Sequence, residues 1–272
     1  MALKHVVYRA LDRGPGRPLI GVVANRRARA AGQRARFAYD RPSGLWSKRT
    51  PGGVMLLPER LQGMGIEECE TFTKDVFLLD YTVKFGDVVL DIGAGIGSES
   101  LPFARWAGAS GKVIAVEAHP ATFATLERTV RLNGVRNVEL VNAAIMDSDK
   151  PVMISDLPAE VSYENRIGSE GVEVAAMTLA GLVEMYDLDR VDFLKMNIEG
   201  AELPALQGSA DMLPLVRHAA IGCHDFLAEE TGDDSYRTKE AIYELLVNAG
   251  FTVRRRDGDP RPWARDYLFA SR

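Results

Sequence analysis

Cysteine is scarce in this chain of 272 residues, which contains only Cys69 and Cys223. The two cysteines lie far apart in the sequence, and neither belongs to a paired motif. Disulfide-stabilised small domains and structural zinc sites need several cysteines at short spacings. We therefore expect neither, and the apolar content of 46% is ordinary for a globular protein with a packed core.

Long apolar runs are also missing. A membrane-spanning helix needs about 20 consecutive apolar residues, and no stretch of the sequence approaches that length. The N-terminus lacks the charged and then apolar pattern of a secretory signal. These absences predict a cytoplasmic protein without a membrane span.

Acidic side chains are rare only at the start of the chain. The first 50 residues contain twelve Lys and Arg against two Asp and Glu, although the whole chain has a formal net charge of −5. Such a region is typical of a solvated surface, or of a surface that attracts an anionic or carrier-linked small molecule. No recognised nucleic-acid-binding motif is present, so nucleic acid is not an expected partner.

The sequence divides into two regions near residue 66. Residues 1–66 are rich in turns, and the strand-like stretches 19–23 and 35–39 predict a small, basic, strand-rich N-terminal extension. Residues 67–272 alternate between strand-like and helix-like segments. The strands are expected at 88–92, 113–117, 138–141, 191–196, 219–223, 251–255 and 267–270, and the helices at 68–83, 98–106, 120–132, 179–186, 201–212 and 235–249. This alternation predicts an α/β domain with a doubly wound, mostly parallel seven-stranded sheet.

The segment Asp91-Ile-Gly-Ala-Gly-Ile-Gly97 forms the end of the first of these strands and the turn after it. Its three glycines let a ligand approach bare backbone, and the start of the next helix directs N–H groups at that ligand. Glu117 ends the second strand, where a carboxylate can accept hydrogen bonds from both hydroxyls of a ribose. A dinucleotide site would have its third glycine one residue later, at Ser98. The leading aspartate and the glycine spacing instead indicate a site for S-adenosylmethionine (SAM).

A second polar segment, Asp192-Phe-Leu-Lys-Met-Asn-Ile-Glu-Gly-Ala-Glu202, spans the end of the fourth strand. Its apolar half predicts a buried strand, and its polar half emerges at the carboxyl edge of the sheet. Ligands of doubly wound sheets bind at that edge. Lys195, Asn197, Glu199 and Glu202 are therefore expected where a methyl acceptor would lie beside the cofactor.

Together with Glu117-Ala-His-Pro120, residues 131–137 and Leu206-Gln-Gly208, these motifs resemble those of the FkbM-type SAM-dependent methyltransferases of class I. The resemblance covers roughly residues 67–272. It implies a Rossmann-like fold and SAM as the cofactor. The expected cofactor-binding residues are Asp91, Gly93, Ala94, Gly95, Gly97, Ser98, Glu117, Ala118, Asn142, Ala144 and Asn197.

One position departs from the family pattern in a way that bears on metal binding. Asn197 stands where the family usually has Asp, and a neutral amide is a poorer metal ligand than a carboxylate. We therefore expect no metal in the site.

The resemblance also implies the reaction, which is methyl transfer to a hydroxyl group of a sugar, a glycolipid or a polyketide-like natural product. An alcohol must lose a proton during this reaction. His224, at the end of a strand, is the expected base because the ordinary pKa of imidazole lies near neutrality. Lys195 is expected to pair with Glu199, or to act as a base if it is desolvated. The expected catalytic residues are His224, Lys195 and Glu199.

Three other functions stay open at this point. Methylation of RNA or protein is one, although the Asn/Asp-Pro-Pro-Tyr/Phe signature of amide and amine methylation is missing. A non-catalytic SAM-binding subunit is suggested by Asn197, and a nucleotide-dependent oxidoreductase is disfavoured by the position of the third glycine. A homodimer is a further open expectation.

Overall fold

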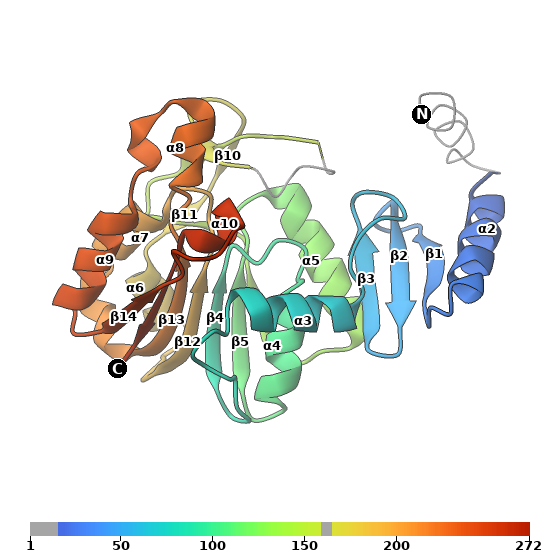
Figure 1. Ribbon diagram of the computed structural model, residues 1–272, viewed down its shortest axis with the longest axis horizontal. Coiled ribbons are helices and arrows are strands. Elements are labelled where there is room, and N and C mark those ends of the chain that lie inside the picture. Colours follow the sequence, from blue (N-terminus) through green and yellow to red (C-terminus); the bar gives the residue numbers. More distant parts are fainter. Residues whose placement is uncertain (1–15, 159–164) are drawn as a thin grey trace.

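A seven-stranded sheet with helices on both faces forms the body of the protein, and a smaller lobe adjoins it (Figure 1). The computed structural model describes residues 16–158 and 165–272. The first 15 residues of the predicted N-terminal extension therefore lie outside the described part. Within the described residues, no helix is both long and apolar enough to cross a membrane.

The large sheet has the strand order β14-β15-β13-β12-β4-β5-β6. Neighbouring strands run parallel, except that β15 is antiparallel to both β13 and β14. The strands are β4 (Val88–Ile92), β5 (Lys112–Val116), β6 (Val138–Val141), β12 (Val191–Met196), β13 (Val216–Gly222), β14 (Thr252–Arg255) and β15 (Tyr267–Ser271). The predicted α/β fold with a mostly parallel seven-stranded sheet is confirmed.

Alternate side chains of each central strand point to opposite faces of the sheet. Leu90 and Ile92 of β4 belong to the core that α6 (Leu179–Met185), α7 (Glu202–Gln207) and α9 (Lys239–Asn248) cover. Val89, which directly precedes Leu90, belongs to the core on the opposite face. That face is covered by α3 (Ile66–Val76), α4 (Ser100–Ala107) and α5 (Pro120–Asn133). Burial on both faces explains why the central strands are almost uninterrupted apolar runs.

Short elements complete the body of the protein. A small antiparallel sheet consists of β8 (Val152–Ile154), β9 (Ile167–Gly168) and β10 (Val172–Val174). The two residues of β7 (Ala144–Ile145) pair with β11 (Ala176–Met177). The remaining elements are α8 (Phe226–Thr231), α10 (Pro262–Arg265) and the 3-10 helices η3 (Ala210–Leu215) and η4 (Asp234–Tyr236).

The N-terminal lobe consists of α2 (Arg17–Ala30) and the antiparallel meander β1 (Arg36–Asp40), β2 (Leu45–Thr50) and β3 (Gly53–Leu57). The strand predicted near residues 35–39 is confirmed. The strand predicted at 19–23 is wrong, because these residues lie in α2. Pro18 fits the first turn of a helix, and the Arg and Ala residues that follow favour helix, so they outweigh the β-branched residues.

Several helices are shorter than predicted. The predicted helix 68–83 ends at Val76, and the one at 201–212 ends at Gln207, with η3 following. A Cβ at Gly208 would lie 2.3 Å from Cα of Asp147, so the chain passes too close to a neighbouring turn for a larger residue there. The helix predicted at 235–249 begins only at Lys239, and the one predicted from residue 98 begins at Ser100.

Two contacts attach the N-terminal lobe to α5. Arg128 donates to both carboxylate oxygens of Asp40, at 2.6 and 3.0 Å, and this lowers the pKa of Asp40 to about 2. The side chain of Asn133 accepts from the N–H of Val54 at 2.8 Å and donates to its C=O at 2.7 Å. Whether the boundary at residue 66 separates two folding units stays a prediction.

Asn133→Ala should destabilise the protein. The substitution leaves both backbone groups of Val54 without their partner, which costs about 1–3 kcal/mol for a partly buried group. Urea unfolding of the variant measures this loss. Arg131→Ala on the same helix is the control, because its exposed pair with Glu127 should contribute less than about 0.5 kcal/mol. Equal stability of the two variants would contradict this role of Asn133.

Candidate active site

The glycine turn after β4 lies where the carboxyl ends of β4, β5 and β12 meet. A Cβ at Gly93, where φ is +78°, would lie 2.0 Å from the backbone oxygen of Asn197, so only glycine lets these two strand ends approach. Beside Gly95, by contrast, an added Cβ would meet no atom within 4 Å. The turn is therefore packed against the protein on one side and open on the other, as a ligand-binding turn must be.

Glu117 lies directly across this turn. Its carboxylate accepts from the N–H of Gly95 and from the N–H of His119, both at 2.9 Å. Burial raises the pKa of Glu117 to about 7, although both hydrogen bonds act in the opposite direction. The side chain of Asn142 donates to the backbone oxygens of Glu117 and Ala118, at 2.8 and 3.0 Å. Asn142 thus holds the segment that carries the acid.

A cavity runs along this edge of the sheet, and it brings together six of the predicted cofactor-binding residues. They are Gly93, Gly95, Glu117, Ala118, Ala144 and Asn197. Five others do not line it: Asp91, Ala94, Gly97, Ser98 and Asn142. Asp91 and Ala94 are fully buried, and the missing side chain of Gly97 admits Leu126 of α5, which would lie 3.0 Å from a Cβ there. A direct contact of any of these residues with the cofactor stays a prediction.

Lys195 is buried beneath the turn and pairs with Asp91. Its ammonium nitrogen lies 3.0 Å from Oδ1 of Asp91 and donates to the backbone oxygen of Gly93 at 2.6 Å. Burial alone would lower the pKa of Lys195, but Asp91 and Glu99 outweigh it and raise this pKa. The expected pairing with Glu199 is therefore wrong. Lys195 and Asp91 face each other in the register of β12 and β4, and a lysine that stays protonated is not a base.

His224 lies between two carboxylates. Nδ1 is 2.9 Å from Oε1 of Glu202, and Nε2 is 3.3 Å from Oε1 of Glu199. Burial alone would lower the pKa of His224, but Glu202 and Glu199 outweigh it and raise this pKa well above its ordinary value. The expectation of a neutral His224 is therefore wrong. A protonated imidazole has no lone pair with which to accept a proton, so the structure does not support His224 as the base.

The chain turns sharply where it carries this ion cluster. Glu199 and His224 both have positive φ, +54° and +55°, which is uncommon for residues other than glycine. Glu202 holds the first of these turns, because its carboxylate accepts from the N–H groups of Ile198 and Gly200 at 2.7 and 2.9 Å. Glu202 is fully buried. Its position in the polar segment was predicted, whereas its contact with His224 was not.

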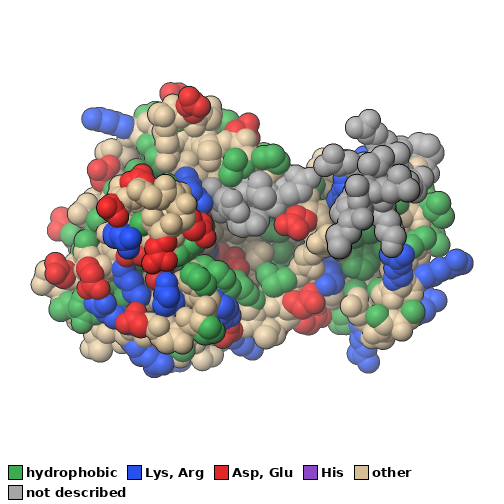
Figure 2. All heavy atoms as spheres, turned by 45° about the horizontal axis from the view of Figure 1, so that its top comes forward, with side chains coloured by type: hydrophobic (Ala, Val, Ile, Leu, Met, Phe, Trp, Pro, Cys, Tyr) green, Lys and Arg blue, Asp and Glu red, His purple; other side chains and the backbone are tan. Residues whose placement is uncertain are grey.

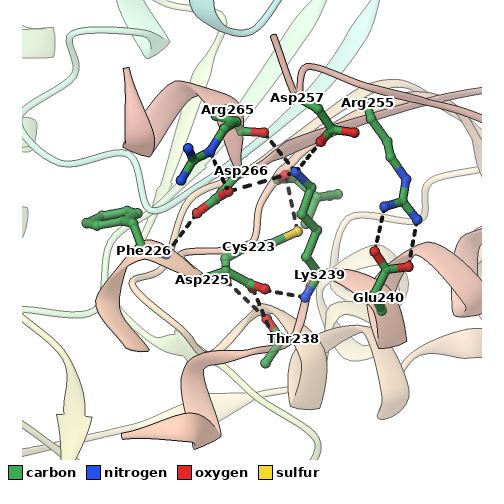
Figure 3. A network of polar contacts seen from close by, with 11 residues as sticks. Cys223, Asp225, Phe226, Thr238, Lys239, Glu240, Arg255, Asp257, Arg265 and Asp266 are labelled. Carbon is green, nitrogen blue, oxygen red and sulfur yellow. Dashed lines mark hydrogen bonds and ion pairs between the residues drawn. The ribbon is translucent and has the colours of Figure 1, made fainter. Parts of the chain in front are cut away.

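A second polar network involves Asp225 and Phe226, which directly follow His224 in the chain (Figure 3). Asp225 accepts from the N–H groups of Thr238 and Lys239 at the start of α9, both at 3.0 Å. The side chain of Lys239 pairs with Asp257 at 2.8 Å. Asp266 accepts from the N–H of Phe226 at 2.8 Å. These contacts fasten the residues around His224 to the segment that leads into β15.

A second cavity, of about 450 Å³, adjoins the first and has the size of a small-molecule pocket. Asn197 and Glu199 line both cavities. The second one has aromatic walls, formed by Phe72, Phe77, Phe226, Trp263 and Tyr267, and its polar residues include Glu99, Arg166 and His224. The hydroxyl of Tyr267 donates to Oδ1 of Asn197. The two cavities therefore meet at one boundary, marked by Asn197 and Glu199.

Sequence reasoning missed Glu99, Arg166 and Tyr267. Glu99 stands beside the glycine turn, so its place next to α4 was a usable signal. Tyr267 belongs to the last strand, and Arg166 directly precedes β9. No local pattern connects either of them with the site. Among the described residues, no group of three or more His, Cys, Asp or Glu side chains is arranged to hold a metal ion.

This strand order, the glycine turn and the acid after β5 together define the class I SAM-dependent methyltransferases. The chain belongs to the family of the methyltransferase FkbM domain, whose model matches residues 91–252. The predicted family and cofactor are thereby confirmed. The open space beside Gly95 and the acid across from it fit the nucleoside of SAM.

The chain is also similar to individual proteins. The methyltransferase sdnD of Sordaria araneosa is 26% identical over 65% of this chain and 77% of its own length. The hexuronic acid methyltransferase AglP of Haloferax volcanii is 24% identical over 85% of both chains. The solved structure of methyltransferase FkbM from Methylobacillus flagellatus KT matches with a TM-score of 0.47 and 16% identity. That match covers 72% of this chain and 45% of that one.

Glu117→Ala should weaken SAM binding by about 2–3 kcal/mol, or about 30- to 150-fold, because charge-assisted hydrogen bonds to the ribose are lost. Calorimetric titration measures the change. Glu127→Ala, at an exposed position on α5, is the matched control. Because the ionised carboxylate is the better acceptor and its pKa is about 7, affinity should fall about tenfold per pH unit below 7. Unchanged affinity in a folded Glu117→Ala variant would contradict the assignment.

Extensive treatment with EDTA should leave methyl transfer nearly unchanged, because Asn197 supplies an amide where a carboxylate ligand would be needed. Turnover of labelled SAM before and after chelation measures this. A loss that magnesium or calcium restores would instead show that carboxylates such as Glu199 and Glu202 bind a cation.

Proposed function

We propose that the protein transfers the methyl group of SAM to a hydroxyl group of a small molecule. The observation that carries this proposal is the meeting of the two cavities at Asn197 and Glu199. A donor in the first cavity and an acceptor in the second would face each other across this boundary. Methyl transfer needs such an in-line arrangement, and positioning supplies much of the catalysis.

The residues of the second cavity support a hydroxylated acceptor. Glu99 and Glu199 line it, and carboxylates accept hydrogen bonds from hydroxyl groups. Trp263 stacks on Phe72 at a ring distance of 5.8 Å and forms a flat apolar wall that suits the face of a sugar ring. The similarity to the hexuronic acid methyltransferase also favours a sugar derivative.

Arg166 supports an acceptor that carries a negative charge. Its Nε is buried and has no hydrogen-bond partner within residues 16–158 and 165–272, and its guanidinium lies 5.9 Å from the ring of Tyr236. A buried donor without a partner is costly, and guanidinium groups pair with carboxylates and phosphates in two-pronged hydrogen bonds. Lys and Arg also gather at the outer end of the N-terminal lobe, whereas both signs of charge mix on the main body (Figure 2).

The test uses labelled SAM with glucuronic acid and glucose as paired acceptors. The label should enter glucuronic acid preferentially, in a product that survives mild base, because methyl ethers are stable there and methyl esters are not. Arg166→Met should raise KM for glucuronic acid by about 10- to 150-fold through loss of a charge-assisted pair, with little effect on glucose. Arg136→Met, at an exposed position outside both cavities, is the control. A base-labile product would contradict hydroxyl transfer.

A further inference from the structure

Most of the ionisable groups at the boundary of the two cavities already have a partner. Lys195 pairs with Asp91, and His224 pairs with both Glu199 and Glu202. The hydroxyl of Tyr267 donates to Asn197, and burial raises the pKa of Tyr267 well above its ordinary value. Each of these groups is therefore fixed in one protonation state near neutral pH.

Glu99 is different. Among the described residues, no side chain donates a hydrogen bond to its carboxylate or forms an ion pair with it within 4 Å, and it lines the second cavity. Its place in the chain explains this position. Glu99 follows Gly97 and Ser98 and directly precedes α4, so the turn that faces the cofactor also presents this carboxylate to the acceptor side.

We propose that Glu99 is the general base that takes the proton of the acceptor hydroxyl. The inference rests on the proposed hydroxyl transfer. In this step the acceptor oxygen bonds to the methyl carbon while the carbon–sulfur bond of the donor breaks. The sulfur keeps the bonding electron pair and becomes a neutral thioether, and the hydroxyl proton passes to a carboxylate oxygen of Glu99. No oxidant or other co-reactant is needed.

The surroundings of Glu99 suit this role. Burial raises the pKa of Glu99 to about 7; Lys195 acts in the opposite direction, and Asp91 raises it further. The other titratable groups near it are Cys69 on α3 and Tyr267 on β15, both of which feel its charge. Glu199, His224 and Arg166 also line this cavity. A base whose pKa lies near the working pH is the most effective one.

Glu99→Gln keeps the shape of the side chain and removes the base. We expect kcat with a hydroxyl acceptor such as glucuronic acid to fall by about 10²–10⁴, while the Kd for SAM stays unchanged. In the wild type, kcat should fall about tenfold per pH unit below about 7, and the variant should lack this dependence. Glu229→Gln, at an exposed position on α8 outside the cavity, is the matched control and should behave as the wild type.

A second readout needs neither donor nor acceptor. The pKa of Glu99 is raised on folding, so its carboxyl stabilises the fold fully below pH 4.5 and loses that contribution as the pH rises to about 7. Glu99→Gln should therefore have the higher Tm at pH 8 and little advantage at pH 4. This comparison also shows that the variant is folded.

The outcomes separate the two proposals. If the wild type methylates no hydroxyl acceptor, the proposed function fails. If the wild type is active and Glu99→Gln keeps its kcat and pH dependence, the role of Glu99 is overturned. Weakened SAM binding with normal kcat at saturation would also overturn it, because Glu99 would then be a cofactor ligand.

Discussion

The buried ion pair between Lys195 and Asp91 is the contact on which the rest of the site depends. It joins β12 to β4 at the point where the glycine turn leaves the sheet, and the same ammonium holds the backbone oxygen of Gly93. Two charges without water are stable only when each has its partner, and removal of one partner typically costs about 3–5 kcal/mol. The ammonium also lowers the pKa of Glu99 and of Glu117, so it restrains the two carboxyls that face the cavities.

His224, which follows the neighbouring strand β13, is a second buried cation that is paired with carboxylates. One buried cation serves two carboxylates, Glu199 and Glu202, and the turns that carry Glu199 and His224 have positive φ. Strained turns persist only where the surroundings hold them, here through the hydrogen bonds of Glu202 and Asp225. The cluster thus fixes the shape of the boundary between the cavities. Each ionised group of the cluster already has a partner within it, and the proposed base, Glu99, lies outside the cluster.

The parts of the site that belong to one continuous sequence motif could be predicted. The contacts between residues on adjacent strands could not. A buried strand followed by glycines, and an acid after the next strand, indicate the cofactor edge because the geometry of a βα unit is local. Lys195 was assigned to Glu199, which is close in sequence, whereas its partner Asp91 lies on the adjacent strand of the sheet. Tyr267 reaches the site only because β15 runs antiparallel beside β13.

The same limit applies to the N-terminal lobe. The β-branched residues at 20–23 favour a strand when they are considered alone, but the Arg and Ala residues that follow favour a helix, and the segment forms α2.

Asn197 shows how a departure from the family pattern fits this particular site. It lies at the boundary of both cavities, near Glu199 and the carboxyl of Glu99. A carboxylate at this position would add a negative charge to a cavity that Glu99 and Glu199 already line. The amide avoids that repulsion, because its oxygen accepts from Tyr267 without a charge. The amide nitrogen is a hydrogen-bond donor, and a neutral amide is a poorer metal ligand than a carboxylate.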